Sequence, residues 1–322
     1  MNQQTTPGNI PTFRRAATRD FDEQASLLQG WNQHYAQLSS GLFHGEIVDL
    51  RFDQVHLFAE STSQALFQSG YLGEDLFALG IPLHAGDHGS FCGEIMHAHA
   101  VHIFTGESGF EFYSPHALTM GGIVLPAALL EPWLENTSPA GALGTQARLL
   151  AVAPDTIHEA RNFLRTTFDL CTRQPALLQS PRFRKQLQDA TLNCVADLLS
   201  DGQAPDDRLT PQKRWNIVHQ AQVMIEQSQD EAPGIESLCA TMGISRRTLQ
   251  YCFQDVLGMN PVAFIRARRL NGVRQMLKQG VAVTEAATAW GFWHFGHFSQ
   301  EYKKQFGELP SDTLKHSLLK IA

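Results

Sequence analysis

The sequence feature that most constrains this chain is a helix, turn and helix pattern that occurs twice near its C-terminus. In the first copy, apolar residues at helical spacing end at Gly243, and Ser245 can cap the next helix by accepting a bond from an early backbone N–H. In the second copy, a short helix ends at Gly291 and another begins at Phe295. The two units, over about 235–256 and 284–306, predict an all-α C-terminal domain.

The second helix of the first unit, predicted over 246–256, has an apolar and a polar face. Leu249 and Phe253 lie at a spacing of four on the apolar face. The opposite face carries Arg246, Arg247, Gln250 and Tyr251. In the major groove, arginine pairs with guanine and glutamine with adenine. The pattern therefore predicts a helix that reads DNA.

A longer helix, predicted over 260–278, connects the two units. Asn260 and Pro261 supply its cap and its first turn. If this helix holds the two second helices one DNA turn apart, about 34 Å, both can enter successive major grooves on one face of the duplex.

Charge is distributed unevenly along the chain. The whole sequence has 25 basic and 32 acidic residues, a net charge of −7, which disfavours a polyanionic partner. Before Pro211 there are 12 basic and 23 acidic residues, whereas from Pro211 onward there are 13 and 9. The basic residues within 240–304 are Arg246, Arg247, Arg266, Arg268, Arg269, Arg274, Lys278, Lys303 and Lys304. Only three acidic residues share that segment, so the C-terminal region suits a polyanion.

Residues 212–322 resemble the AraC/XylS class of transcription regulators. The resemblance depends on the motif G-F-x(5)-F-S-x(2)-[FY]-K-x(2)-F-G-x(2)-P from Gly291 to Pro310. It implies two helix-turn-helix units joined by a long helix. The DNA-contacting positions that it implies are Arg246, Arg247, Gln250, Tyr251, Phe295, Gly296, His297, Gln300 and Lys303. Tyr251 and Gln300 are often arginine in the family, and the second unit has few charges that could reach bases. We therefore expect the first unit to supply most of the sequence discrimination, with weaker contacts from His297 and Gln300.

The resemblance also implies partners. They are double-stranded promoter DNA, RNA polymerase, a small-molecule effector and a second copy of the chain in a homodimer; most members are activators. The runs at 245–250, 268–271 and 291–298 narrow the match to a subgroup that includes the ethanolamine-utilisation regulator. That subgroup implies an amine or alcohol effector. Adenosylcobalamin would be a co-effector if the match held in full, although no local motif demonstrates a corrinoid site, and no other cofactor is expected.

The N-terminal half alternates between apolar and polar residues in short stretches. We expect strands over 46–52, 55–59, 65–72, 77–83, 90–97, 100–104, 109–113 and 118–125. Their close spacing without intervening helices predicts an antiparallel, cupin-like sandwich or barrel with a ligand site at its mouth. Helices are expected over 22–38, 126–135, 155–173 and 180–199. The fold class is therefore α+β with two domains.

The helix over 180–199 carries an apolar stripe that permits two interpretations. The stripe can pack on the sandwich, or on the same helix of a second subunit. Residues 201–211 are polar and contain proline, as linkers do. We expect a sensing and dimerisation domain over 1–200, a linker over 201–211 and a DNA-binding domain over 212–322.

Candidate ligand-binding residues in the sandwich are His97, His99, Phe91 and Phe112. His97 and His99 would share one strand face, as the histidines of a cupin metal site do, but the next acidic residue, Glu107, comes eight residues after His99. We therefore expect pocket-lining or structural histidines, with no metal. Two alternatives stay open: a cupin-type metalloenzyme fused to a DNA-binding module, with His97 and His99 as ligands, or a regulator without an effector.

Other function classes find little support in the sequence. It contains no G-x-G-x-x-G, Walker or H-E-x-x-H motif, so we expect no catalytic residues and no enzyme activity. The five cysteines form no C-x-x-C pair, which argues against a disulfide framework or zinc site. Residues 1–15 are polar, and the uncharged stretch 112–130 contains Pro115 and Pro126. We expect a cytoplasmic protein without a membrane segment.

Overall fold

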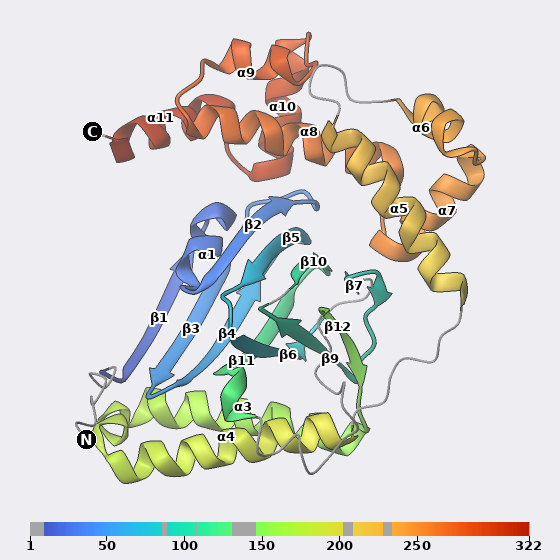
Figure 1. Cartoon of the computed structure of the whole chain (residues 1–322). Coiled ribbons are helices and arrows are strands. Elements are labelled where there is room, and N and C mark those ends of the chain that lie inside the picture. The colour runs from blue at the N-terminus through green and yellow to red at the C-terminus, as the bar shows by residue number, and fades with distance from the viewer. Residues whose placement is uncertain are drawn as a thin grey trace.

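The computed structural model describes residues 10–85, 89–106, 108–130, 146–201, 209–227 and 234–321. Within them the chain has a strand-rich N-terminal region and a helical C-terminal region (Figure 1). The sheets lie between two helical layers, with α3 and α4 on one side and the C-terminal helices on the other.

The described strands form two antiparallel sheets. The larger sheet has the order β1 (Thr12–Thr18), β3 (Gly45–Phe52), β4 (Val55–Thr62), β11 (Leu118–Pro126), β6 (Leu76–His84), β9 (Ala100–Thr105) and β12 (Arg148–Ala151). The smaller sheet has the order β2 (Trp31–Gln37), β5 (Leu66–Leu72), β10 (Gly109–Ser114), β7 (Ser90–Phe91) and β8 (Glu94–Ile95). Apolar and polar residues that alternate along a strand favour such sheets, because successive side chains point to opposite faces.

Aromatic and aliphatic side chains fill the space between the sheets. Phe58 and Phe104 of the larger sheet belong to one buried cluster with Phe91, Phe110 and Phe112 of the smaller sheet. These rings meet mostly edge to face, as Phe104 and Phe110 do with centroids 5.0 Å apart. The two sheets are therefore joined by a largely aromatic core.

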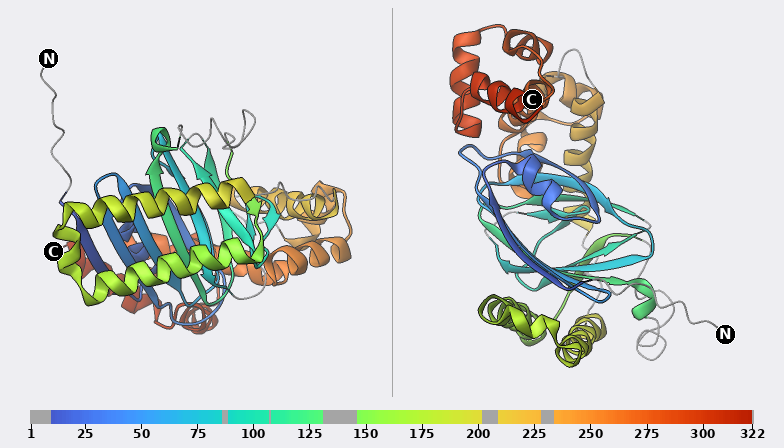
Figure 2. Two further views of the ribbon diagram at one scale, coloured as in Figure 1. Left: turned by 90° about the horizontal axis from the view of Figure 1, so that it is seen from below. Right: turned by 90° about the vertical axis from the view of Figure 1, so that its left-hand side faces the viewer.

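The outer face of the larger sheet is covered by two helices. α3 (Pro154–Arg173) and α4 (Pro181–Asp201) lie side by side across it (Figure 2), joined by the short 3₁₀ helix η2 (Pro175–Gln179). Leu164 of α3 and Val195 of α4 are fully buried in one cluster with Leu57 and Ile81 of the sheet. The apolar stripe of α4 thus packs within its own subunit, the first of the two interpretations that the sequence left open.

The C-terminal region consists of helices joined by short turns. They are α5 (Leu209–Gln227), α6 (Ile235–Met242), α7 (Arg246–Leu257), α8 (Pro261–Lys278), α9 (Val283–Ala289), α10 (Phe295–Phe306) and α11 (Pro310–Ile321). The expected helices over 246–256, 260–278 and 295–306 correspond to α7, α8 and α10. The expected linker overlaps residues 202–208, which lie outside the described residues, and α5 begins at Leu209.

The helix expected over 22–38 is wrong for its second half. Asp20 caps α1 (Phe21–Leu27) by accepting a bond of 2.9 Å from the Asp22 N–H, and the helix ends after two turns. Gly30, with a φ of +92°, then takes a left-handed conformation that glycine adopts without strain. The chain then continues as β2. Its residues have apolar positions at helical spacing, but they form a strand because they pair with β5.

Three further differences concern short segments. Residues 126–130 end β11 and form the 3₁₀ helix η1 (Ala127–Leu129) instead of the expected helix, whose remainder, 131–135, lies outside the described residues. The expected strand over 90–97 is two short strands, because Cys92 and Gly93 form a turn with positive φ. β1 and β12 were not predicted, since neither alternates clearly in sequence.

Among the described helices, none combines the length and apolarity needed to cross a membrane.

Candidate DNA-binding surface

The first helix pair, α6 and α7, has the geometry that its turn residues predict. Gly243 ends α6 in the left-handed conformation with a φ of +64°. Ser245 caps α7, and its hydroxyl accepts a 3.0 Å hydrogen bond from the backbone N–H of Thr248. Leu249 and Phe253 are fully buried beneath α7. The two helices are therefore fixed relative to each other by a cap, a turn and a shared core.

The predicted contact residues of α7 all lie on its outer face. Arg246, Arg247 and Gln250 are exposed, and Tyr251 is 65% exposed. Among the described residues, neither Arg246 nor Arg247 forms an ion pair with an acidic side chain. Both guanidinium groups lie on the exposed side of α7.

The second helix pair, α9 and α10, presents a different surface. Phe295, Gly296, His297, Gln300 and Lys303 are all exposed on α10. His297 Nδ1 lies 3.1 Å from Glu301 Oε1. A carboxylate beside His297 disfavours a phosphate at that position.

Aromatic residues of the second pair divide between core and surface. Phe298 is buried and packs against Phe292, with ring centroids 5.1 Å apart, while Trp290 is half-buried in the same cluster. Trp293 and Phe295 are 68% and 43% exposed. Phe298 and Phe292 therefore belong to the core of the second pair, and the two exposed rings border the candidate surface.

The helix α8 holds the second pair through its side chains and a glycine. Arg269 donates 2.7 Å hydrogen bonds to the carbonyl oxygens of Trp290 and Gly291, at the end of α9. Its guanidinium also stacks on Phe292, 4.8 Å from the ring centroid. Gly272 lies against the indole of Trp290 so closely that a Cβ there would overlap the ring.

We expect Gly272→Ala to lower the free energy of unfolding by about 1–3 kcal/mol, since the added methyl overpacks the contact with Trp290. The matched control is Gly296→Ala in α10, where a Cβ would meet no atom within 4 Å. That substitution should stabilise the chain by about 0.5–1 kcal/mol through helix propensity alone. Chemical denaturation of both variants tests the contact, and equal effects would contradict it.

The basic excess of residues 240–304 is not all available to a polyanion. Arg269 is used inside the domain, and Arg266 lies 3.3 Å from Glu301. Arg268 stacks over Phe67 of β5, 5.2 Å from the ring centroid. Arg274 and Lys278 pair with acidic residues of the N-terminal region. The exposed cations that border α7 and α10 are therefore fewer than the sequence count indicates.

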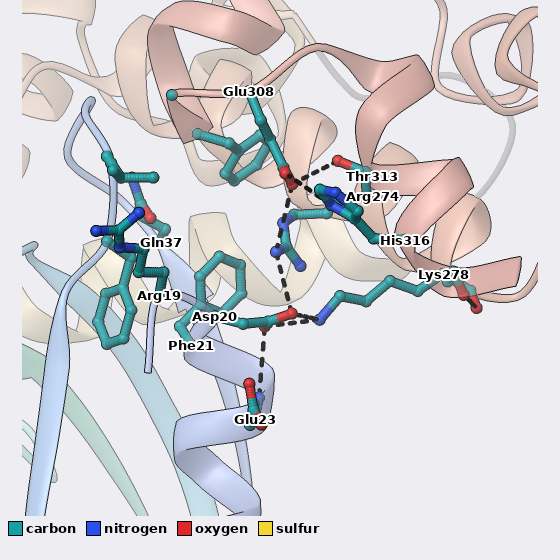
Figure 3. Close-up of a pocket in the computed structure, with 15 residues that line it drawn as sticks. Arg19, Asp20, Phe21, Glu23, Gln37, Arg274, Lys278, Glu308, Thr313 and His316 are labelled. Carbon is teal, nitrogen blue, oxygen red and sulfur yellow. Dashed lines mark hydrogen bonds and ion pairs between the residues drawn. The ribbon is translucent and has the colours of Figure 1, made fainter. Parts of the chain in front are cut away.

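An ion cluster joins α8 to the start of α1 (Figure 3). Arg274 has a side chain only 6% exposed, and it lies 2.8 Å from Asp22 and 3.4 Å from Asp20. Lys278 Nζ lies 2.6 Å from Asp20 and also contacts Asp22. Burial by itself would raise the pKa of Asp20, but Arg274 and Lys278 outweigh it and lower that pKa to about 2. The cluster borders a cavity of about 610 Å³.

The free edge of β2 is capped by two buried amides of the C-terminal region. Asn271 of α8 accepts a 2.9 Å bond from the Gln37 N–H and donates one of 2.8 Å to the Gln37 carbonyl. Gln305 of α10 donates a 3.0 Å bond to that same carbonyl. These side chains bond the backbone of Gln37 at the end of an edge strand, so the strand-rich region is docked on α8 and α10.

The candidate ligand residues are not brought together. His97 and His99 lie exposed in the loop between β8 and β9, and so they share no strand face. Phe91 and Phe112 are buried between the sheets. Among the described residues, no group of three or more histidine, cysteine, aspartate or glutamate side chains could hold a metal ion.

Two buried titratable groups lie between the sheets and are not among the predicted site residues. His102 is fully buried against Phe91, neither of its ring nitrogens has a partner among the described residues, and burial lowers its pKa to about 3. Glu60 is also buried, which raises its pKa to about 7 although bonds from Tyr35 and Gln24 act in the opposite direction. No local signal marks either residue, because their burial depends on which strands face each other.

Comparisons with known proteins match the C-terminal region. A helix-turn-helix domain family model matches residues 238–316. The XylDLEGF operon transcriptional activator 2 of Pseudomonas putida is 37% identical over 94 residues, which cover 28% of this chain and 60% of that protein. The HTH-type transcriptional regulator GbdR of Pseudomonas aeruginosa is 33% identical over 90 residues, 28% of this chain and 24% of that protein.

A solved structure, that of a probable AraC family transcriptional regulator from Rhodopseudomonas palustris, is 38% identical. It covers 32% of this chain and 97% of its own, with a TM-score of 0.30. The chain spans less than two thirds of the length of both curated relatives. The family model and the curated relatives support the AraC/XylS resemblance, and residues 238–316 match a helix-turn-helix domain.

Proposed function

We propose that the whole chain is a sequence-specific transcription regulator, with a sensing region over 1–200, a linker over 201–211 and a DNA-binding region over 212–322. The observation that carries the proposal is the outer face of α7. Arg246, Arg247 and Gln250 are exposed there in a rigid, capped helix, and the two arginines have no acidic partner among the described residues. A helix of this kind fits the major groove.

The second helix pair has a supporting role in this proposal. Phe295 and Gln300 of α10 would contact the neighbouring major groove, where an aromatic ring meets a thymine methyl and glutamine meets adenine. Gly296, His297 and Lys303 would lie beside the backbone. Because Glu301 already pairs with His297, we assign most of the base discrimination to α7 and its Tyr251.

We expect Arg247→Ala to weaken binding to a specific duplex by about 1–3 kcal/mol, because a bidentate contact to guanine is lost. The specific duplex is one that the full-length protein selects from a random library, and a scrambled duplex serves as the reference. Fluorescence anisotropy measures both. The control, Arg173→Ala, removes an exposed arginine from α3 and should leave both affinities unchanged.

Two other results would revise this assignment. An equal loss on the selected and the scrambled duplex would make Arg247 a phosphate contact, and the slope of affinity against salt would then fall by about one. No loss on either duplex would remove α7 from the DNA interface.

The proposal also covers the effector, the oligomeric state and the effect on transcription. A small catabolite, an amine or an alcohol such as ethanolamine, would bind the sensing region and change how it docks on α8 and α10. Adenosylcobalamin would act beside it only if the ethanolamine-type subgroup applies. The regulator would act as a homodimer, recruit RNA polymerase at promoter DNA and activate transcription. The contact between Gln37 and Asn271 supports coupling between the sensing region and the DNA-binding region. The Asn271 side chain bonds both the backbone N–H and the carbonyl of Gln37, at the end of β2.

Sedimentation and transcription measurements test these parts separately. Sedimentation equilibrium of the full chain, with and without ethanolamine, reports the dimer and any effect of the amine on it. Transcription in vitro from the selected duplex with purified RNA polymerase reports activation. A monomer at every concentration, or a transcript level that the protein does not raise, would exclude the corresponding part.

A further inference from the structure

A cavity between the two sheets contains a carboxylate without a cation. Glu60 of β4 is 6% exposed and lines a space of about 30 Å³. Its carboxylate accepts bonds from the Tyr35 hydroxyl at 2.9 Å and from Gln24 Nε2 at 3.1 Å. Both partners are neutral, and no ion pair to Glu60 occurs among the described residues. A buried carboxylate needs a counter-ion to be ionised without a large cost.

The walls of this cavity are largely aromatic. Trp31 of β2 packs edge to face against Phe58, Phe104 and Phe110, with ring centroids 6.0, 5.0 and 5.8 Å away. All four rings line the space beside Glu60. Aromatic rings attract organic cations through their quadrupoles, and rings grouped around a carboxylate form the usual surroundings of a bound ammonium group.

Two hydrogen-bond donors in the same lining have no partner among the described residues. They are the indole Nε1 of Trp31 and the amide Nε2 of Gln68, a side chain that is 4% exposed. Buried donors in native proteins are almost always bonded. Their presence beside Glu60 indicates a guest that supplies an acceptor oxygen as well as a positive charge.

We propose that this cavity binds a small organic ammonium ion that carries an oxygen acceptor, with Glu60 as its counter-ion and Trp31 and Gln68 as donors to the oxygen. The proposal rests on the proposed function, because it names the chemical class of the effector. A volume of this size holds about two water molecules at roughly 10–15 Å³ each, so the guest has only a few non-hydrogen atoms.

The strand β2 connects this cavity to the helix pairs. Trp31 lines the cavity, and Tyr35 bonds Glu60 while belonging to the buried cluster that includes Leu270 of α8. Two residues further on, Gln37 bonds Asn271 and Gln305. A guest that changes the bonding of Glu60 therefore acts on the same strand that docks the DNA-binding region.

Three probes of similar size and different charge test the proposal by calorimetric titration of the full-length protein. Ethanolammonium chloride should bind, whereas neutral ethylene glycol and anionic acetate should not. Glu60→Gln should weaken ethanolammonium binding by about tenfold or more, because a charge-assisted bond is lost. The control, Asp169→Asn, removes an exposed carboxylate of α3 and should leave the binding unchanged.

A second variant tests the donors to the oxygen separately from the counter-ion Glu60. It keeps the proposal testable even if Glu60→Gln does not fold. Gln68→Met should weaken the binding of ethanolammonium but leave that of ethylammonium, which has no oxygen, unchanged.

The affinity of the native chain for ethanolammonium should fall about tenfold per unit as the pH decreases from 6.5 to 5.5. Burial raises the pKa of Glu60 to about 7, so a proton competes with the guest in this range. Tyr35, the titratable side chain bonded to Glu60, stays neutral there, since burial raises its pKa well above 10.0.

Three results would overturn the proposal: no binding of ethanolammonium by the folded full chain, equal binding of ethylene glycol, or binding of acetate instead. The selected duplex is titrated with the same protein preparation. If that duplex binds and ethanolammonium does not, the proposed regulator stands and this effector class is excluded. If neither binds, the proposed function fails with it.

Discussion

Replacing Arg274 by alanine should lower the free energy of unfolding by about 3–5 kcal/mol, the usual effect of removing one partner of a buried ion cluster. Arg274 is 6% exposed and contacts Asp20 and Asp22, and its guanidinium lies 4.6 Å from the ring centroid of Phe21 and 5.4 Å from that of Phe306. Without it, the two carboxylates face each other with only Lys278 between them. Urea denaturation followed by circular dichroism measures the loss.

Two controls identify its cause. Arg173→Ala removes an exposed arginine paired with Asp169 on α3 and should cost less than about 0.5 kcal/mol. Arg274→Met keeps an apolar stem between Phe21 and Phe306, so a variant that recovers most of the stability would assign the effect to packing instead of charge. A loss below about 1 kcal/mol in Arg274→Ala would show that the cluster contributes little to docking.

Acid should reveal the same cluster. The pKa of Asp20 is about 2 in the folded chain, below its ordinary value of 3.8. A lowered pKa contributes stability that is fully present above the unfolded value and is lost as the pH falls through the folded one. The contribution of Asp20 is therefore lost between about pH 3.8 and pH 2, and Asp20→Asn should remove that part of the pH dependence.

Between pH 6.5 and pH 4.5, two buried groups should have opposite effects on the free energy of unfolding. The pKa of His102 is lowered by burial to about 3, so only the unfolded state takes up a proton on this residue in this window. The free energy of unfolding therefore decreases as the pH decreases. The pKa of Glu60 is raised by burial to about 7, so the folded state holds a proton that the unfolded state has lost, and stability rises as the pH falls.

Single substitutions should separate the two slopes. In His102→Leu, which keeps the site apolar and of similar volume, the free energy of unfolding should rise by roughly 2 kcal/mol from pH 6.5 to 4.5. In Glu60→Gln it should fall by about the same amount. His56, whose pKa is lowered chiefly by burial, adds a contribution of the same sign as His102.

Urea denaturation at several pH values measures these slopes, with the exposed His116 changed to glutamine as the control. Parallel pH profiles for the native chain and His102→Leu would show that His102 takes up a proton in the folded state. A Glu60→Gln profile parallel to that of the native chain would likewise place the folded pKa of Glu60 near its unfolded value.

The helix pairs could be predicted because their signals are local. Gly243 and Ser245 determine a turn and a cap through their own backbone preferences, and the spacing of Leu249 and Phe253 selects the buried face of α7. The exposure of Arg246 and Arg247 follows from that spacing. Most strands were predicted for a similar reason, since period-two alternation is also a short-range pattern.

The errors arose where a distant contact outweighs a local preference. Residues 31–37 have helical spacing, yet they form β2 because they pair with β5 and bond Asn271 of α8. The basic count of residues 240–304 overstated the surface charge, because Arg274 and Lys278 find their acidic partners about 250 residues earlier in the sequence.

By itself the sequence determined the C-terminal helices, their exposed residues and the helix-turn-helix class, since caps, turns and apolar spacing act over a few residues. Only the tertiary structure decided that α4 packs on its own sheet, that His97 and His99 lie apart from the buried aromatic residues, and that Glu60, Gln68 and Trp31 line one cavity. The physical reason is that burial and partner choice between the sheets depend on which strands face each other, and residues far apart in the chain make that choice.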